Sequence, residues 1–230
     1  MIITPLSLLT ALILGVIPAL LWLWFWLYED RLHPEPRTAL ALTFFTGMCL
    51  VLMVIPIQKL FASVLTSQLI IFTGWAFIEE VAKYLGAQLA ILKSKVVDEP
   101  IDPMIYMITI ALGFAALENT LFLMNPLSGT TLAETIFTGN FRFFGATLLH
   151  VLCSSIVGAA LALSFYIHGY THRLHVVAGV ILAGSLHTLF NLSIITFGGS
   201  ALFMTFASVW LGIILLLLFF QYIKYYKKTA

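Results

Sequence analysis

Ionisable side chains interrupt several long apolar stretches of this sequence, at spacings that place them on common helix faces. Glu79, Glu80 and Lys83 fall within one such stretch. Residues three or four apart are neighbours on a helix, so Lys83 can pair with either glutamate. A buried glutamate is a candidate general base that removes a proton from water. This stretch therefore points to hydrolysis.

Polar residues that can take part in hydrolysis recur in three later apolar stretches. Glu118 is followed by Asn119, a histidine occurs at His150, and His187 and Asn191 are four residues apart. A histidine can hold a water molecule, and a histidine and an asparagine one turn apart can both donate hydrogen bonds to an oxyanion. We expect these groups to meet in one cavity.

The residues are consistent with a metal-free mechanism and with a zinc-dependent one, because carboxylates and imidazoles also bind zinc. The expected catalytic residues are Glu79, Glu80, Glu118, His150, His187 and Asn191, with Lys83 and Asn119 in supporting roles. If a metal is bound, its expected ligands are Glu79, Glu118, His150 and His187.

The surrounding sequence indicates a membrane protein. Apolar residues make up 61% of the 230 residues and charged residues only 9%, against about 25% charged in soluble domains. A charge at the centre of a bilayer costs about 2.5–3.5 kcal/mol, so charged residues found there are functional candidates.

We predict an all-α bundle formed by one domain, 1–230, because about 20 apolar residues span a bilayer as a helix. The seven expected spans are 5–28, 39–58, 67–92, 103–124, 143–167, 175–197 and 200–223. The first is read as a span, since it lacks the features of a cleavable signal peptide. A connection near 125–142 and a tight turn at 198–200 complete the expected topology.

Basic residues in the connections predict the orientation, since they favour the cytoplasmic side. With seven spans, one side carries Arg31, Arg37, Lys93, Lys95, Arg173, Lys224, Lys227 and Lys228. The other side carries only Lys59 and Arg142. We therefore expect the N-terminus outside and the C-terminus in the cytoplasm.

Other interpretations use the same residues. Glu79 and Lys83 can form a purely structural ion pair, and buried polar groups can act only as a scaffold that joins helices. A proton- or ion-coupled transporter can use the glutamates as a relay, although no internal repeat typical of transporters is visible. Cys153 beside His150 is a conceivable nucleophile that lacks an orienting acid. Otherwise Cys153 and Cys49 are expected to be buried packing residues.

The sequence lacks the residues that several other classes of protein require. The sequence has no His-Glu-x-x-His zinc helix and no Gly-x-Ser-Gly segment around a serine nucleophile. An intramembrane aspartate pair is also excluded, since all three aspartates are expected in loops: Asp30, Asp98 and Asp102. No basic run indicates nucleic-acid binding.

These motifs together resemble those of PrsW-type intramembrane proteases, a family related to the type II CAAX prenyl endopeptidases and the ABI proteins. Segment 78–83, Ile-Glu-Glu-Val-Ala-Lys, resembles the first motif, and segment 113–119, Gly-Phe-Ala-Ala-Leu-Glu-Asn, the second. His150-x-x-x-Ser154 and His187-x-x-x-Asn191 resemble the third and fourth. The resemblance extends from about 18 to 191.

The resemblance implies an endopeptidase of a prokaryotic plasma membrane that cleaves a membrane-embedded or membrane-anchored protein. For PrsW-type proteins it implies first-site cleavage of an anti-sigma factor on its extracytoplasmic side. It also implies that Glu79 is the base and that His187 and Asn191 form the oxyanion hole. The CAAX endopeptidases and ABI proteins commonly have histidine where this chain, like PrsW proteins, has Glu118, and they have a more distant arginine in place of Lys83. Either Glu118 or His150 is therefore left to hold the water.

Overall fold

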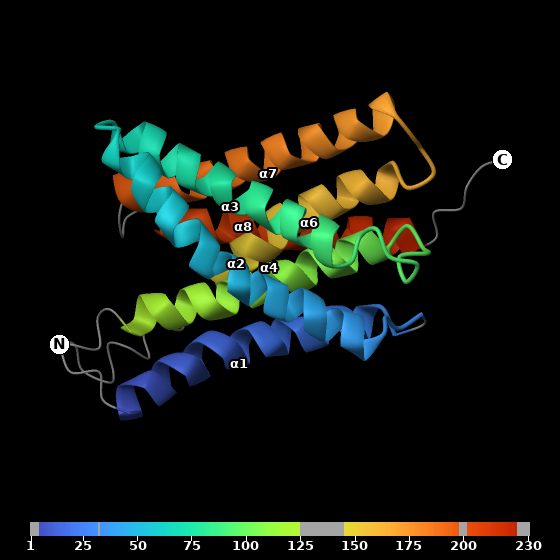
Figure 1. The fold of residues 1–230 in the computed structure, drawn as a ribbon, viewed down its shortest axis with the longest axis horizontal. Coiled ribbons are helices and arrows are strands. Elements are labelled where there is room, and N and C mark those ends of the chain that lie inside the picture. Colours follow the sequence, from blue (N-terminus) through green and yellow to red (C-terminus); the bar gives the residue numbers. More distant parts are fainter. Residues whose placement is uncertain (1–4, 32, 125–144, 198–201, 225–230) are drawn as a thin grey trace.

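The computed structural model describes residues 5–31, 33–124, 145–197 and 202–224. Within these ranges the chain forms seven α-helices and no strand, which confirms the all-α prediction (Figure 1). The helices are α1 (Pro5–Glu29), α2 (Arg37–Ser63), α3 (Gln68–Ala90), α4 (Asp102–Met124), α6 (Thr147–Leu163), α7 (Tyr170–Phe197) and α8 (Leu202–Lys224). Each matches one predicted stretch. The expected connection at 125–142 and the turn at 198–200 lie outside the described residues.

Five of these helices are long and apolar enough to cross a membrane: α1, α2, α4, α7 and α8. Helix α3 has 23 residues, about 35 Å at 1.5 Å per residue, but carries three charges near its middle. Helix α6 is apolar and shorter, with 17 residues. The chain is an integral membrane protein, and its total of seven spans stays a prediction.

Helix α4 lies at the centre of the bundle, where it packs against α1, α2 and α6. Its sequence is apolar on all sides, as expected of a helix without a solvent face. Helices α3 and α7 pack against each other on the side of the bundle opposite to α1 (Figure 1). Helix α3 also contacts α2, and α7 also contacts α6. This arrangement brings α3, α4, α6 and α7 around a shared interior.

Helices α2 and α4 cross at a very short distance. A Cβ atom added to Gly113 would lie 1.9 Å from the carbonyl oxygen of Phe44, and one added to Gly47 would lie 2.1 Å from that of Ile110. Only glycine allows backbones this close. From the crossing the two helices diverge toward Ser63 and Met124 (Figure 1).

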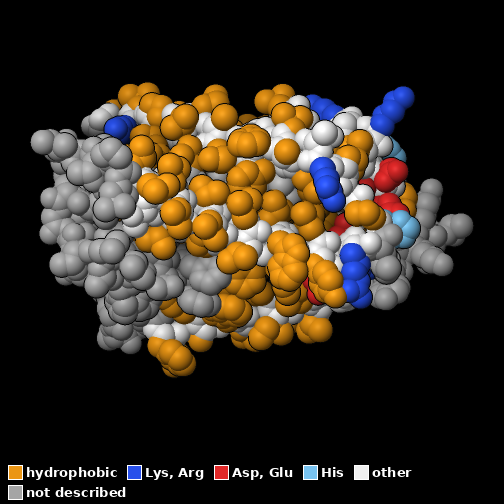
Figure 2. Space-filling view, turned by 90° about the horizontal axis from the view of Figure 1, so that it is seen from below, with side chains coloured by type: hydrophobic (Ala, Val, Ile, Leu, Met, Phe, Trp, Pro, Cys, Tyr) orange, Lys and Arg blue, Asp and Glu red, His pale blue; other side chains and the backbone are white. Residues whose placement is uncertain are grey.

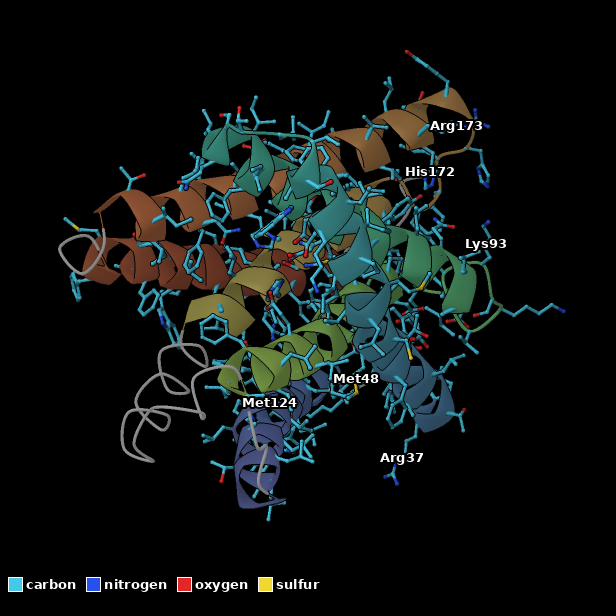
Figure 3. All side chains as sticks on the ribbon, turned by 60° about the vertical axis from the view of Figure 1, so that its left-hand side comes forward. Arg37, Met48, Lys93, Met124, His172 and Arg173 are labelled. Atoms are coloured by element: carbon cyan, nitrogen blue, oxygen red, sulfur yellow. The ribbon has the colours of Figure 1, made fainter. Side chains whose placement is uncertain are left out.

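The surface shows a broad apolar belt, with basic and acidic side chains gathered toward one end (Figure 2). Arg37 at the start of α2, Lys93 after α3 and Arg173 in the first turn of α7 lie at the same end of the bundle (Figure 3). This grouping agrees with the arrangement that the predicted orientation requires. The prediction that both cysteines are buried is wrong for Cys49, which is exposed on α2, and right for Cys153.

Candidate active site

The structure brings six of the predicted site residues together from four helices. Helix α3 contributes Glu79, Glu80 and Lys83, and α4, α6 and α7 contribute Glu118, His150 and His187. We call these six residues the polar cluster. Five of them are almost completely buried, and the Glu118 side chain is 31% exposed. The fold therefore brings these six side chains together, as the sequence led us to expect.

Lys83 and Glu80 form the innermost ion pair of the polar cluster. Lys83 Nζ lies 2.5 Å from Glu80 Oε1, and neither side chain is exposed. The sequence allowed either glutamate as the partner, and the structure selects Glu80. Ser154, which was expected only to pack, donates its hydroxyl to Glu80 Oε2 at 3.3 Å. Ser154, which belongs to the third motif together with His150, therefore also contacts the Glu80 carboxylate.

His150 has both ring nitrogens engaged. Lys83 Nζ lies 3.0 Å from Nδ1 of His150, and Glu118 Oε2 lies 2.9 Å from its Nε2. An ammonium group only donates hydrogen bonds, so Nδ1 must accept. The proton of the neutral ring is then on Nε2, which donates to Glu118. His150 thus orients the Glu118 carboxylate and has no lone pair left for a metal ion.

His187 has the opposite arrangement. Its Nδ1 lies 2.9 Å from Glu80 Oε1, and a carboxylate only accepts hydrogen bonds when it is ionised. Nδ1 therefore carries the proton and Nε2 keeps its lone pair. A carboxylate behind a histidine in this way is typical of metal sites, where it sets the tautomer of the ligand.

The Nε2 atom of His187 faces Glu79. Glu79 Oε2 lies 3.8 Å from this nitrogen, and it is buried without a hydrogen-bond partner. Two acceptor atoms thus face each other across a gap. A buried acceptor without a partner costs about 1–3 kcal/mol. A cation or a water molecule between the two atoms would satisfy both.

The other oxygen of Glu79 is held by Gln58, which was not among the predicted site residues. Gln58 Nε2 donates to Glu79 Oε1 at 2.8 Å. The predicted span ended at residue 58, whereas α2 continues to Ser63. A glutamine at the end of a span is ordinary, but one inside an apolar helix is a signal, so an accurate helix boundary would have drawn attention to it.

A cavity of about 360 Å³ opens beside these groups, between α2, α3 and α4. Glu79, Glu118 and Gln58 contribute polar atoms to its lining, and its walls are mostly apolar. The apolar side chains of this wall are Val51, Val54, Ile55, Phe114, Leu121 and Phe122. Glu79 and Glu118 therefore line the cavity, and neither His187 nor His150, the histidines that they contact, is part of the lining.

The two predicted asparagines are on the same helices as two members of the polar cluster. Asn191 is one turn beyond His187 on α7 and is partly buried, and no hydrogen bond joins it to the cluster within the described residues. Asn119 donates to the hydroxyl of Thr147 at 2.9 Å, which links α4 to the start of α6. The role of Asn191 in an oxyanion hole stays a prediction.

Two groups of described residues have atoms close enough to hold a metal ion. One is Glu79, His150 and His187, and the other is Glu80, Cys153 and His187. Glu80 is already bonded to Lys83, Ser154 and His187. The unpartnered Oε2 of Glu79 and the available Nε2 of His187 fit a cation better.

A second set of acidic residues lies at the far end of α4. Asp102 begins α4 instead of lying in a loop, and its carboxylate accepts hydrogen bonds from the backbone N–H groups of Asp98 and Glu99. Tyr106 donates its hydroxyl to Glu35. Burial raises the pKa of the Glu35 carboxyl and raises that of Asp30 to about 7. These contacts hold the connections to α4, and this set contains none of the described metal-ligand groups.

A family model described as PrsW family intramembrane metalloprotease matches residues 35–222. The chain is also similar to Protease PrsW of Geobacillus kaustophilus (strain HTA426), with 29% identity over 125 residues, 53% of this chain and 56% of that protein. It is similar to Protease PrsW of Bacillus subtilis (strain 168), with 26% identity over 156 residues, 66% of this chain and 65% of that protein. The matches thus cover less than two thirds of either relative. No solved structure gives a significant match.

Proposed function

Because the chain belongs to the PrsW family of intramembrane metalloproteases, we propose that it is an endopeptidase that cuts a membrane-anchored protein in the cavity beside Glu79 and Glu118. The observation that carries this proposal is the pair of facing acceptors, Glu79 Oε2 and His187 Nε2, 3.8 Å apart. They lie next to a second carboxylate and beside a cavity.

Glu79 and His187 are the residues that would hold a divalent metal ion, with Glu118 as the nearest further carboxylate in the cavity. Such an ion would act as a Lewis acid and make its bound water more acidic. Zinc suits this mixed set of carboxylate and imidazole ligands. His150 is less suited, because Lys83 and Glu118 occupy both of its nitrogens.

Glu118 is the group that we assign to proton transfer. Its carboxylate lines the cavity, and the Nε2–H group of His150 holds one of its oxygens at 2.9 Å. A carboxylate held in this way can take a proton from the attacking water and deliver it to the leaving amine. This assignment moves the role of base from Glu79 to Glu118, and it supports Glu118 over His150 as the residue that positions the water.

The substrate that we propose is a membrane-anchored protein with an apolar segment at the cut site, such as an anti-sigma factor. The cavity is bordered by apolar side chains of α2 and α4, which suit apolar side chains on either side of the cut bond. The relatives found in Geobacillus and Bacillus support a bacterial plasma membrane as the location.

The test compares Glu79→Gln, Glu118→Gln and the control Glu99→Gln, all purified in detergent. Glu99 lies in the α3–α4 connection, away from the polar cluster. Cleavage of a co-reconstituted single-span anti-sigma factor and zinc binding by calorimetry are both measured. We expect Glu79→Gln to lose both, Glu118→Gln to bind zinc and lose about 10²–10⁴-fold in rate, and Glu99→Gln to match the wild type.

Other outcomes assign the roles differently. Zinc binding retained by Glu79→Gln, together with lost cleavage, would make Glu79 the base of a glutamate mechanism. Full cleavage by both variants would reject the proposed site. Loss of cleavage in Cys153→Ala, with zinc binding and folding intact, would instead favour a cysteine nucleophile.

A further inference from the structure

Gln58 joins α2 to α3 at the rim of the cavity through two hydrogen bonds. Its side-chain amide donates to Glu79 Oε1 at 2.8 Å. Its backbone carbonyl accepts a hydrogen bond from Nε1 of Trp75 at 3.1 Å. All three residues line the cavity. The backbone and the side chain of Gln58 are therefore both held in place.

We propose that Gln58 is a positioning residue, whose amide holds Oε1 of Glu79 and so turns Oε2 toward Nε2 of His187. The proposal rests on the proposed function, in which Glu79 and His187 hold the metal ion. A glutamate side chain has several rotatable bonds, and holding one carboxylate oxygen leaves the other with a defined direction. In metal sites, such hydrogen bonds to a ligating carboxylate orient it toward the ion.

The distribution of hydrogen bonds on Glu79 supports this role over simple space filling. One oxygen is satisfied by Gln58, and the other is buried with no partner. An arrangement that served stability alone would be expected to satisfy both, because an unsatisfied buried acceptor costs about 1–3 kcal/mol. The oxygen that lacks a partner is the one that faces His187.

The experiment replaces Gln58 by methionine, which keeps the length of the side chain and removes the donor. Gln88→Met is the matched control, since Gln88 donates to the hydroxyl of Tyr84 on the same helix and takes no part in the polar cluster. Zinc affinity by calorimetry, kcat and KM for the anti-sigma substrate, and thermal unfolding are measured on all proteins. The infrared carboxylate band that is lost in Glu79→Gln is followed as well, because it reports the hydrogen bond without zinc or activity.

We expect Gln58→Met to lower zinc affinity by about 10–100-fold, to lower kcat more than it changes KM, and to shift the Glu79 carboxylate band. Gln88→Met should leave all three unchanged. A Gln58→Met protein with wild-type zinc affinity, kcat and carboxylate band would overturn the proposal, and so would a change in unfolding temperature alone.

The infrared band separates this proposal from the proposed function. If the wild type neither binds zinc nor cleaves, but the band shifts in Gln58→Met, then the proposed function is wrong and Gln58 still orients Glu79. If the wild type binds zinc and cleaves, and Gln58→Met leaves the band in place, then the proposed function holds and the role of Gln58 is rejected.

Discussion

The two histidines of the polar cluster are identical in type and similar in burial, yet their partners give them different capacities. His150 receives a hydrogen bond from Lys83 and donates to Glu118, while His187 donates to Glu80 and keeps a lone pair toward Glu79. The difference arises from the charge of each neighbour, because an ammonium donates and a carboxylate accepts. Lys83 and Glu80 thus decide which histidine can bind a cation.

The Glu80–Lys83 pair allows a test of this dependence. Lys83→Met leaves a buried carboxylate without its cation, and breaking a buried pair in this way costs about 3–5 kcal/mol. We expect a large fall in unfolding temperature in detergent, and no cleavage.

The double variant Glu80→Gln/Lys83→Met removes both charges. It should recover most of the stability, since an uncharged pair avoids the desolvation penalty. It should remain inactive, because neither histidine is then held in its tautomer. Equal stability of Lys83→Met and the wild type would contradict the assignment of this ion pair.

Helices α2 and α4 shape the cavity through the way they cross. The contact at Gly47 and Gly113 brings their backbones together on one side of the site. Beyond the crossing they diverge (Figure 1). Glu79 of α3 lines the cavity together with residues of both helices. The separation of Gln58 from Glu118 therefore depends on a crossing point that lies away from both.

Adding a single methyl group at the crossing tests this dependence. In Gly113→Ala the new Cβ would overlap the Phe44 carbonyl, which is backbone and cannot rotate away. We expect destabilisation by about 1–3 kcal/mol and reduced cleavage, measured by thermal unfolding and by the substrate assay.

Gly86→Ala serves as the control for this substitution. Its Cβ would lie 2.7 Å from Cδ1 of Leu50, the end of a flexible side chain. Alanine is also favoured over glycine in a helix by about 1 kcal/mol. This variant should be as stable as the wild type or more so. A Gly113→Ala protein that behaves like Gly86→Ala would show that the close crossing is dispensable.

The bundle as a whole has one charged end and one apolar belt (Figure 2). Arg37, Lys93 and Arg173, which are among the basic residues that predict the orientation, lie at this end (Figure 3). Gln221 donates to Glu29 and His33 lies 3.4 Å from Glu99, so segments distant in sequence meet here. This end is the one that we assign to the cytoplasm.

Cysteine labelling tests this orientation. Cys49 and Cys153 are replaced by alanine, and one new cysteine is placed at Ser67 or at Ser94. Ser67 precedes α3 and Ser94 follows it, and both are exposed. With a membrane-impermeant maleimide, we expect Ser67→Cys to react in intact cells and Ser94→Cys only after lysis. The reverse pattern would invert the topology.

The sequence was sufficient for the fold class, the positions of the seven described helices and the six members of the polar cluster. These properties are local, since apolar length and three- or four-residue spacing depend only on neighbours along the chain. It also sufficed to place Glu79 and Lys83 near each other, but the choice of Glu80 as the partner of Lys83 was not contained in the spacing.

The partners of each polar side chain came from the packing of the helices. The hydrogen bond from Gln58 and the contact of Ser154 with Glu80 depend on how far each helix is rotated and where it crosses its neighbours. These rotations follow from contacts between residues far apart in the chain, such as Phe44 and Gly113. Periodicity within one helix cannot supply them, and so the direction of each donor and acceptor is a property of the assembled bundle.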